Sequence, residues 1–137
     1  MPEVPESHTR ALLAARAALE KHAEGVVVMD VRTLSSVTDF FVICTADSPR
    51  QLNAIKDHVE AKLAEAGSAV WHVEGATSPR TPARTAAHEP QWMLMDCGEI
   101  VVHLLDQQTR SFYRLEDLWA DAPRVPIESF DRLRTQH

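Results

Sequence analysis

The sequence predicts an α/β fold built as one domain, and three observations support this prediction. The 137 residues are about one domain's worth of chain and are enough to bury a hydrophobic core. Apolar residues make up 45% of the chain and charged residues 25%, which is the composition of an ordinary globular protein. Runs of β-branched residues alternate with segments whose apolar residues recur at three- and four-residue intervals. Strands and amphipathic helices are therefore expected to alternate along the chain.

The expected elements and segments can be given as residue ranges. The elements are a helix over 7–22, strands over 26–31 and 39–45, a helix over 49–66, strands over 69–73, 91–97 and 100–106, and a short helix within 109–119. The domain is expected to span 7–121, between a flexible N-terminus (1–6) and a C-terminal tail (122–137), with a long Pro-rich loop over 76–90.

Local signals justify the elements of the first half. Ser7 is placed to cap the first helix, and Gly25 is placed to follow its end. The run Val26–Val31 is typical of a strand that is buried on both faces. The second helix has the clearest signals, because Ser48 supplies a capping hydroxyl and Pro49 suits the first helical position.

Composition also excludes several classes of protein. No apolar run reaches the length of about 20 residues that a membrane helix needs, and the acidic N-terminus does not resemble a secretory signal. We therefore expect a cytoplasmic domain with no membrane partner, in which Cys44 and Cys97 are buried thiols. With 14 basic and 20 acidic residues, the formal net charge is −6. Direct, sequence-specific binding to nucleic acid is therefore not expected.

No motif in the chain predicts catalysis. His72, His88 and His103 lie in separate segments, and no pair of histidines has the helical spacing typical of a zinc site. A nucleophile elbow of the G-x-S-x-G type is absent, and so is a phosphate-binding G-x-x-x-x-G-K-[ST] loop. We therefore expect no catalytic residue, no metal and no cofactor.

The two strands around Gly98 carry the most information, because alternation sorts their side chains onto two faces. A two-residue turn, at 97–98 or at 98–99, gives the same sorting. One face is wholly apolar and should face the core; it holds Met93, Met95, Cys97, Ile100, Val102 and Leu104. The other face is mixed and holds Trp92, Leu94, Asp96, Val101, His103 and Leu105.

Two interpretations of the mixed face stay open. In the first, a helix covers it, and Asp96 and His103 are paired with the backbone or with each other. In the second, part of it is exposed as a docking patch, for which a tryptophan ringed by polar groups is typical.

Motifs in the second half of the chain resemble a known family. The block W-x-x-x-D-x-G-[DE]-x-V-V-H covers Trp92–His103, and R-x-F-Y-x-L-E-x-L-W covers Arg110–Trp119. They follow Asp39–Ile43, Ser48–Gln51 and the pair Glu74-Gly75 in the order found in the ribosomal silencing factor family, RsfS, also called Iojap-like. The resemblance covers roughly residues 12–121. It implies an α/β sandwich, a mixed sheet flanked by helices, that is related to the nucleotidyltransferase fold but lacks its catalytic residues.

The resemblance also implies a function. Members of this family bind the large ribosomal subunit through a basic ribosomal protein at the intersubunit face, block joining of the small subunit, and so repress translation. They often form homodimers. From the resemblance and the mixed face, we expect the partner to contact Trp92, Leu94, Asp96, Gly98, Glu99, His103, Arg110 and Tyr113.

Two alternatives are kept beside this hypothesis. The first is a divergent nucleotidyltransferase-like enzyme or nucleotide-binding protein, with Ser48 and Asp39 near a phosphate. The second is a structural dimer whose mixed face is its own interface.

Overall fold

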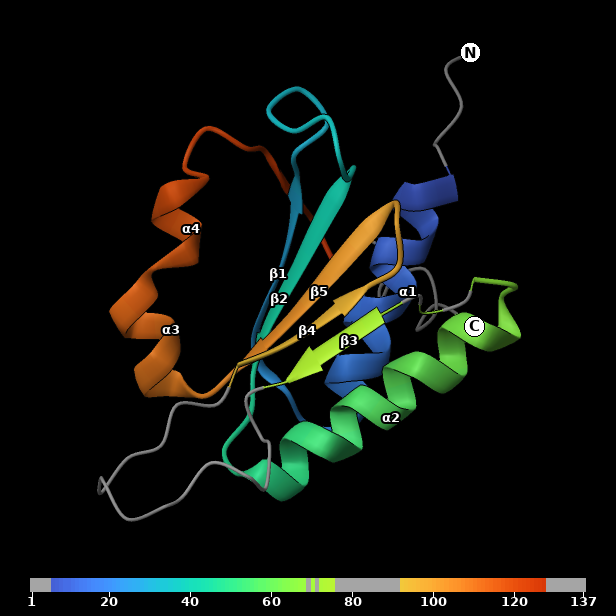
Figure 1. Ribbon diagram of the computed structural model, residues 1–137, viewed down its shortest axis with the longest axis vertical. Coiled ribbons are helices and arrows are strands. Elements are labelled where there is room, and N and C mark those ends of the chain that lie inside the picture. Colours follow the sequence, from blue (N-terminus) through green and yellow to red (C-terminus); the bar gives the residue numbers. More distant parts are fainter. Residues whose placement is uncertain (1–5, 69, 71, 76–91, 128–137) are drawn as a thin grey trace.

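The computed structural model describes residues 6–68, 70, 72–75 and 92–127. The predicted Pro-rich loop over 76–90, most of the predicted flexible N-terminus and the tail beyond residue 127 lie outside the described residues. Helices lie on both sides of one sheet (Figure 1). None of the described helices is both long and apolar enough to cross a membrane.

Most elements agree closely with the ranges predicted from the sequence, with three differences. The strand predicted over 69–73 lies over 72–75, the short helix predicted within 109–119 is two helices that begin at 107, and a strand over 124–125 was not predicted. The helices are α1 (Glu6–Glu20), α2 (Pro49–Glu65), α3 (Gln107–Tyr113) and α4 (Leu115–Leu118). The strands are β1 (Glu24–Asp30), β2 (Phe40–Thr45), β3 (His72–Gly75), β4 (Trp92–Asp96), β5 (Ile100–Leu105) and β6 (Arg124–Val125). They form one six-stranded mixed sheet in the order β3-β4-β5-β2-β1-β6. Only β2 and β5 pair in parallel, and the other neighbours in this sheet are antiparallel.

One prediction about β1 was wrong. The run Val26–Val31 was expected to be buried on both faces, but Val26 and Val27 are only half-buried. Among the residues that the structure describes, the sheet continues beyond β1 only with the two-residue strand β6, which pairs with Val28 and Met29. The N-terminal end of β1 therefore lies near an edge of the sheet, where less of the molecule covers it.

The main hydrophobic core lies between one face of the sheet and the helices α1 and α2. Small side chains on α1, among them Ala11, Ala14 and Ala18, are buried there. On α2, the helical spacing predicts one apolar face made of Leu52, Ile55, Val59, Leu63 and Ala66. The first four are buried, whereas Ala66, at the C-cap, is exposed. Both cysteines are free and buried, as predicted.

The start of α2 explains the Ser48–Gln51 motif in structural terms. The Ser48 hydroxyl accepts a hydrogen bond from the backbone N–H of Gln51 (3.1 Å), and Pro49 occupies the first turn. The side-chain amide of Gln51 then donates to the carbonyls of Lys21 (3.2 Å) and His22 (2.9 Å), just after α1. The motif therefore begins one helix and fastens the end of the other to it.

The second face of the sheet is covered only in part. A smaller cluster, formed by Met29, Val31, Ile43, Leu105 and Ala122, is buried on the side where α3 and α4 lie. Towards β3, the side chains of Leu94, Asp96 and Val101 on the same face are only half-buried. This strip of the second face, on β4 and β5, is therefore less buried than the part of that face that holds the smaller cluster.

Candidate functional site

The β4–β5 hairpin sorts its side chains as the sequence predicted. The N–H of Cys97 donates to the carbonyl of Ile100 (2.9 Å), so the turn consists of Gly98 and Glu99. Every member of the predicted core face is buried: Met93, Met95, Cys97, Ile100, Val102 and Leu104. Trp92 pairs with Leu105, Leu94 with His103, and Asp96 with Val101, which puts these residues on the opposite face.

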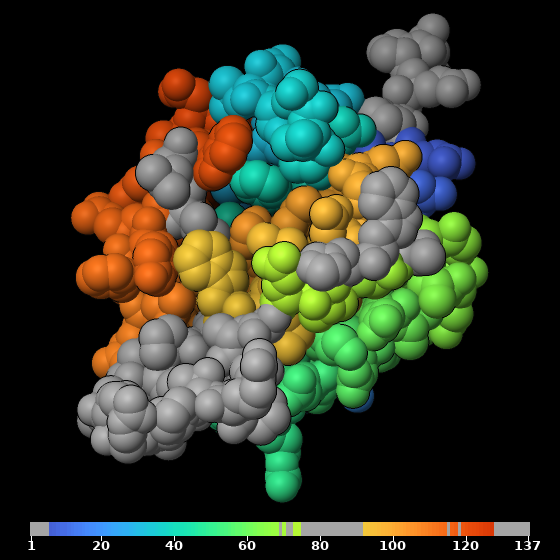
Figure 2. All heavy atoms as spheres, in the orientation of Figure 1, coloured from blue at the N-terminus to red at the C-terminus, as the bar shows by residue number. Residues whose placement is uncertain are grey.

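The candidate site is the less buried strip of this second face together with the exposed aromatic residues of α3. We call it the docking face and define it by Trp92, Leu94, Asp96, Val101, Phe112 and Tyr113. Figure 2 shows atoms of the hairpin (yellow to orange) at the surface between β3 and the orange-red segment of α3 and α4. Phe112 is 78% exposed and Tyr113 48% exposed, which is unusual for large aromatic side chains outside an interface.

Three aromatic rings of the docking face form a continuous row. The ring of Tyr113 lies 4.9 Å from that of Trp92, centroid to centroid, and the ring of Phe112 lies 5.0 Å from that of Tyr113. These distances are typical of favourable aromatic contacts. The row joins strand β4 to helix α3, so the strand and the helix both contribute to one apolar surface. Phe112 was missed in the sequence analysis, although its position beside Tyr113 in the R-x-F-Y motif was a usable signal.

His103 lies beneath the docking face and does not reach its surface. It is 7% exposed, and its Nδ1 accepts a hydrogen bond from Nε1 of Trp92 (3.2 Å). The rings of His103 and Phe41 also form a T-shaped contact, with their centroids 5.1 Å apart. Burial lowers the pKa of His103 to about 4, so the imidazole is neutral at pH 7. His103 therefore supports Trp92 from inside.

The polar residues at the tip of the hairpin are engaged within the molecule. Oδ1 of Asp96 accepts the backbone N–H of Gly98 (2.9 Å), so this carboxylate stabilises the turn. Glu99 pairs with Arg10 of α1 at 2.8 Å. In the first interpretation of the mixed face, Asp96 was paired with the backbone, and this is the pairing observed.

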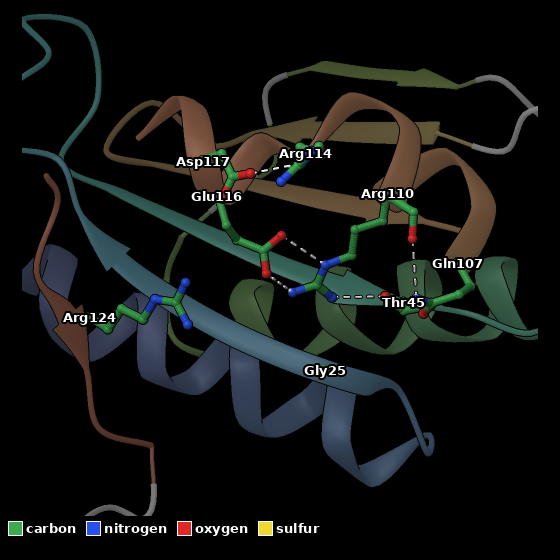
Figure 3. Close-up of a pocket in the computed structure, with 9 residues that line it drawn as sticks. Gly25, Thr45, Gln107, Arg110, Arg114, Glu116, Asp117 and Arg124 are labelled. Carbon is green, nitrogen blue, oxygen red and sulfur yellow. Dashed lines mark hydrogen bonds and ion pairs between the residues drawn. The ribbon is translucent and has the colours of Figure 1, made fainter. Parts of the chain in front are cut away.

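Arg110 is buried and paired as well. Its Nε and Nη2 bind both carboxylate oxygens of Glu116, at 3.2 and 2.6 Å, and its Nη1 donates to the Thr45 hydroxyl at 2.8 Å. The hydrogen bond from Arg110 holds the pKa of Glu116 below its usual range. Figure 3 shows this group at one side of an open pocket, with the side chain of Arg124 across from it.

The eight predicted contact residues therefore fall into three groups. Trp92, Leu94, Asp96 and Tyr113 belong to the docking face. Gly98 and Glu99 form the hairpin turn beyond it. His103 and Arg110 are buried beneath or beside it.

The geometry contradicts the phosphate site of the enzyme alternative. Asp39 precedes β2 and Ser48 follows it, so a whole strand of six residues, about 20 Å, separates them. Asp39 accepts a hydrogen bond from Ser7 (2.8 Å), and Ser48 caps α2. Within the part of the chain that the structure describes, no three His, Cys, Asp or Glu side chains are grouped as metal ligands would be.

Comparison with known proteins gives consistent matches. The family model described as "Ribosomal silencing factor during starvation" matches residues 4–137. The ribosomal silencing factor RsfS of Halalkalibacterium halodurans is 35% identical over 116 residues, which cover 85% of this chain and 90% of that protein. RsfS of Bacillus subtilis is 34% identical over 116 residues, covering 85% and 89%. A crystal structure of a Chromobacterium violaceum protein superposes with a TM-score of 0.70 at 28% identity, covering 85% of this chain and 88% of that one.

Proposed function

The chain belongs to the ribosomal silencing factor family, and from this membership we propose that it binds the large ribosomal subunit through a basic ribosomal protein at the intersubunit face. Bound there, it would block joining of the small subunit by steric exclusion and so repress translation. The relatives are named as silencing factors rather than as enzymes, and in this proposal no bond is made or broken. We propose the cytoplasm as its location.

The observation that carries the proposal is the exposed aromatic row of the docking face. Exposed Tyr and Trp side chains with polar neighbours are the residues that most often dominate the binding energy of protein interfaces. Here Phe112 and Tyr113 are exposed, and Trp92 is half-buried beside them. We propose that these three rings supply most of the affinity.

Charge supports a basic partner. The chain carries a formal net charge of −6, which attracts a basic protein surface and repels the phosphates of ribosomal RNA. Glu74 lies directly across from Leu94 on the neighbouring strand, on the same face, and is exposed. Because Asp96 and Glu99 already have partners within the molecule, we propose that they tune the orientation and rate of binding more than its strength.

A second copy of the chain is the other partner that the same surface suits. An exposed aromatic row is also typical of homodimer interfaces, and the family resemblance led us to expect homodimers. We propose that the protein dimerises in the absence of ribosomes.

The relation of this fold to the nucleotidyltransferase fold, without the activity of that fold, also stays a prediction.

A subunit-joining assay tests the proposed function. Purified small and large subunits are mixed with the protein, and formation of the joined ribosome is followed in a sucrose gradient. We expect the wild-type protein to reduce joining and to sediment with the large subunit. The double variant Phe112→Ala/Tyr113→Ala should lose both effects, whereas Leu19→Ala, a matched exposed residue on α1 across the sheet, should keep them. Normal joining in the presence of excess wild-type protein would refute the proposal.

The same variants show whether the docking face serves ribosome binding or dimerisation. If Phe112→Ala/Tyr113→Ala produced monomers in a sizing experiment but left large-subunit binding unchanged, the docking face would belong to the dimer. If it lost subunit binding, the surface would belong to the ribosome contact.

A further inference from the structure

Arg110 was expected to touch the partner, but the structure gives it a different place. It is 9% exposed, and its guanidinium contacts two other elements of the fold. One side of the guanidinium holds Glu116 of α4 through two hydrogen bonds, and the other donates to Thr45 at the end of β2 (Figure 3). A planar guanidinium suits this task, because its donors are fixed in a fork that can serve several acceptors at once.

The main chain leaves room for this side chain at Gly25. A Cβ atom at Gly25 would lie 2.9 Å from Nη1 of Arg110, closer than a real contact allows. The backbone of Gly25 also has a positive φ of 56°, which favours glycine. The first strand is thus shaped to let the guanidinium pass close to it.

Helix α3 depends on this anchor more than a longer helix would. It has only seven residues, and an isolated helix of that length is not stable in water. Its buried residues are Thr109 and Arg110, which come just before the exposed pair Phe112 and Tyr113. The carbonyl of Arg110 also accepts the N–H of Arg114 (2.8 Å), which ends the helix immediately after Tyr113.

We propose that Arg110 is a positioning residue of the docking face: by tying α3 to β2 and α4, it holds Tyr113 against Trp92 and so assembles the aromatic row. Its role in ribosome binding rests on the function proposed above. Its effect on Tyr113 does not, and can be measured on the protein alone.

The chain offers a direct probe, because Tyr113 is its only tyrosine. Protein labelled with 3-fluorotyrosine should show a single fluorine resonance, shifted from its position in the denatured chain by the ring of Trp92, 4.9 Å away. In Arg110→Ala we expect this resonance to move more than halfway towards the denatured position. Arg32→Ala is the matched control: it removes a comparable two-bonded arginine–carboxylate pair, with Asp30, that is exposed and lies outside α3.

A milder variant keeps the test valid if Arg110→Ala does not fold. Glu116→Gln keeps the shape of the carboxylate but removes its charge, and Thr45→Val removes one acceptor with little change of volume. Each should move the fluorine resonance in the same direction by a smaller amount, while thermal unfolding stays cooperative. An unchanged resonance in folded Arg110→Ala, or in both milder variants, would overturn the proposal.

Binding to large subunits supplies the second readout. Arg110→Ala should weaken binding at least fivefold in the wild-type background. In the Tyr113→Ala background, which keeps Trp92 and Phe112 and therefore measurable binding, it should change binding less than twofold, because a positioning residue has no effect once the residue that it positions is gone. Equal losses in both backgrounds would show that Arg110 contacts the ribosome itself and would overturn the proposal. If the wild-type protein does not bind subunits at all, the proposed function fails, and the fluorine measurement still decides the role of Arg110.

Discussion

The indole N–H of Trp92 donates to Nδ1 of His103 at 3.2 Å, from one strand of the hairpin to the other. The tryptophan therefore has its polar group satisfied inside the protein and offers only its ring surface to a partner. Because Nδ1 accepts this bond, the neutral imidazole carries its proton on Nε2. This pair links the exposed aromatic row to the buried part of the second sheet face.

The Trp92 ring should be a major source of affinity. We expect Trp92→Ala to weaken binding to the large subunit by about 2 kcal/mol or more, because the partner loses a large apolar contact. Trp92→Phe keeps a ring at this position and should lose less. Co-sedimentation with large subunits measures both, with Leu19→Ala on α1 as the control. Sedimentation of Trp92→Ala at the wild-type level would remove this residue from the interface.

Stability should depend on pH through His103. Its pKa in the folded protein is lowered to about 4 by burial, whereas an unfolded histidine has an ordinary value of about 6.5. Protonation therefore favours the unfolded chain. The contribution of His103 to the free energy of unfolding is fully present above pH 6.5 and falls as the pH drops towards 4. Between pH 7 and 4.5 the protein should lose about 2–3 kcal/mol of stability through this residue.

Urea unfolding at several pH values checks this prediction. His103→Gln cannot titrate in this range, so its loss of stability between pH 7 and 4.5 should be smaller than that of the wild type. Parallel pH profiles for the two proteins would contradict this prediction, because they would show that His103 has the same pKa in the folded and unfolded states.

Alanine substitutions at Gly25 and Gly67 distinguish two costs to stability: the clash with Arg110 and the strain of the backbone. Both have positive φ angles, 56° and 82°, so an alanine at either position should cost about 1 kcal/mol from strain. Only at Gly25 does the new Cβ meet another side chain, since nothing lies within 4 Å at Gly67. We therefore expect Gly25→Ala to lower the free energy of unfolding more than Gly67→Ala, as measured by chemical denaturation.

The excess cost at Gly25 should vanish when Arg110 is also replaced. In the Arg110→Ala background, Gly25→Ala and Gly67→Ala should cost similar amounts, because the guanidinium is no longer there. A persistent difference would assign the extra cost to the β1 backbone.

Gln51 should contribute to stability by joining α2 to the end of α1. Its side-chain amide donates to two carbonyls at residues 21 and 22. Removing it in Gln51→Ala leaves those carbonyls without this donor and should cost about 1–2 kcal/mol. Asn53→Ala is a matched control, because its amide bonds only to Pro49 of its own helix. Equal midpoints for the two variants in a denaturant titration would contradict the prediction.

Much of the fold could be predicted from local patterns. The capping pair Ser48-Pro49 located the start of α2, and the spacing of Leu52 and its successors identified the face that is buried. Two-residue alternation around Gly98 identified the core face of the hairpin completely. These predictions succeeded because each depends on residues that are close in the chain, where backbone geometry sets which side chains share a face.

The candidate site could be predicted only in part. Sequence reasoning placed Trp92 and Tyr113 together in one patch, and the structure brings their rings into contact. It treated His103 and Arg110 as surface residues of the same patch, and both are buried. Alternation shows which face of a strand a side chain is on, but it does not show whether another element covers that face.

The sequence by itself determined the order of helices and strands, the core face of the hairpin and the resemblance to its family. Tertiary structure decided which half of the second sheet face is covered, and therefore which residues a partner can reach. Arg110 meets Thr45 from 65 positions away in the chain, and Glu99 meets Arg10 from 89. Such pairs form only when packing brings distant segments together. The polar residues of the motifs were visible in the sequence, but their partners were not.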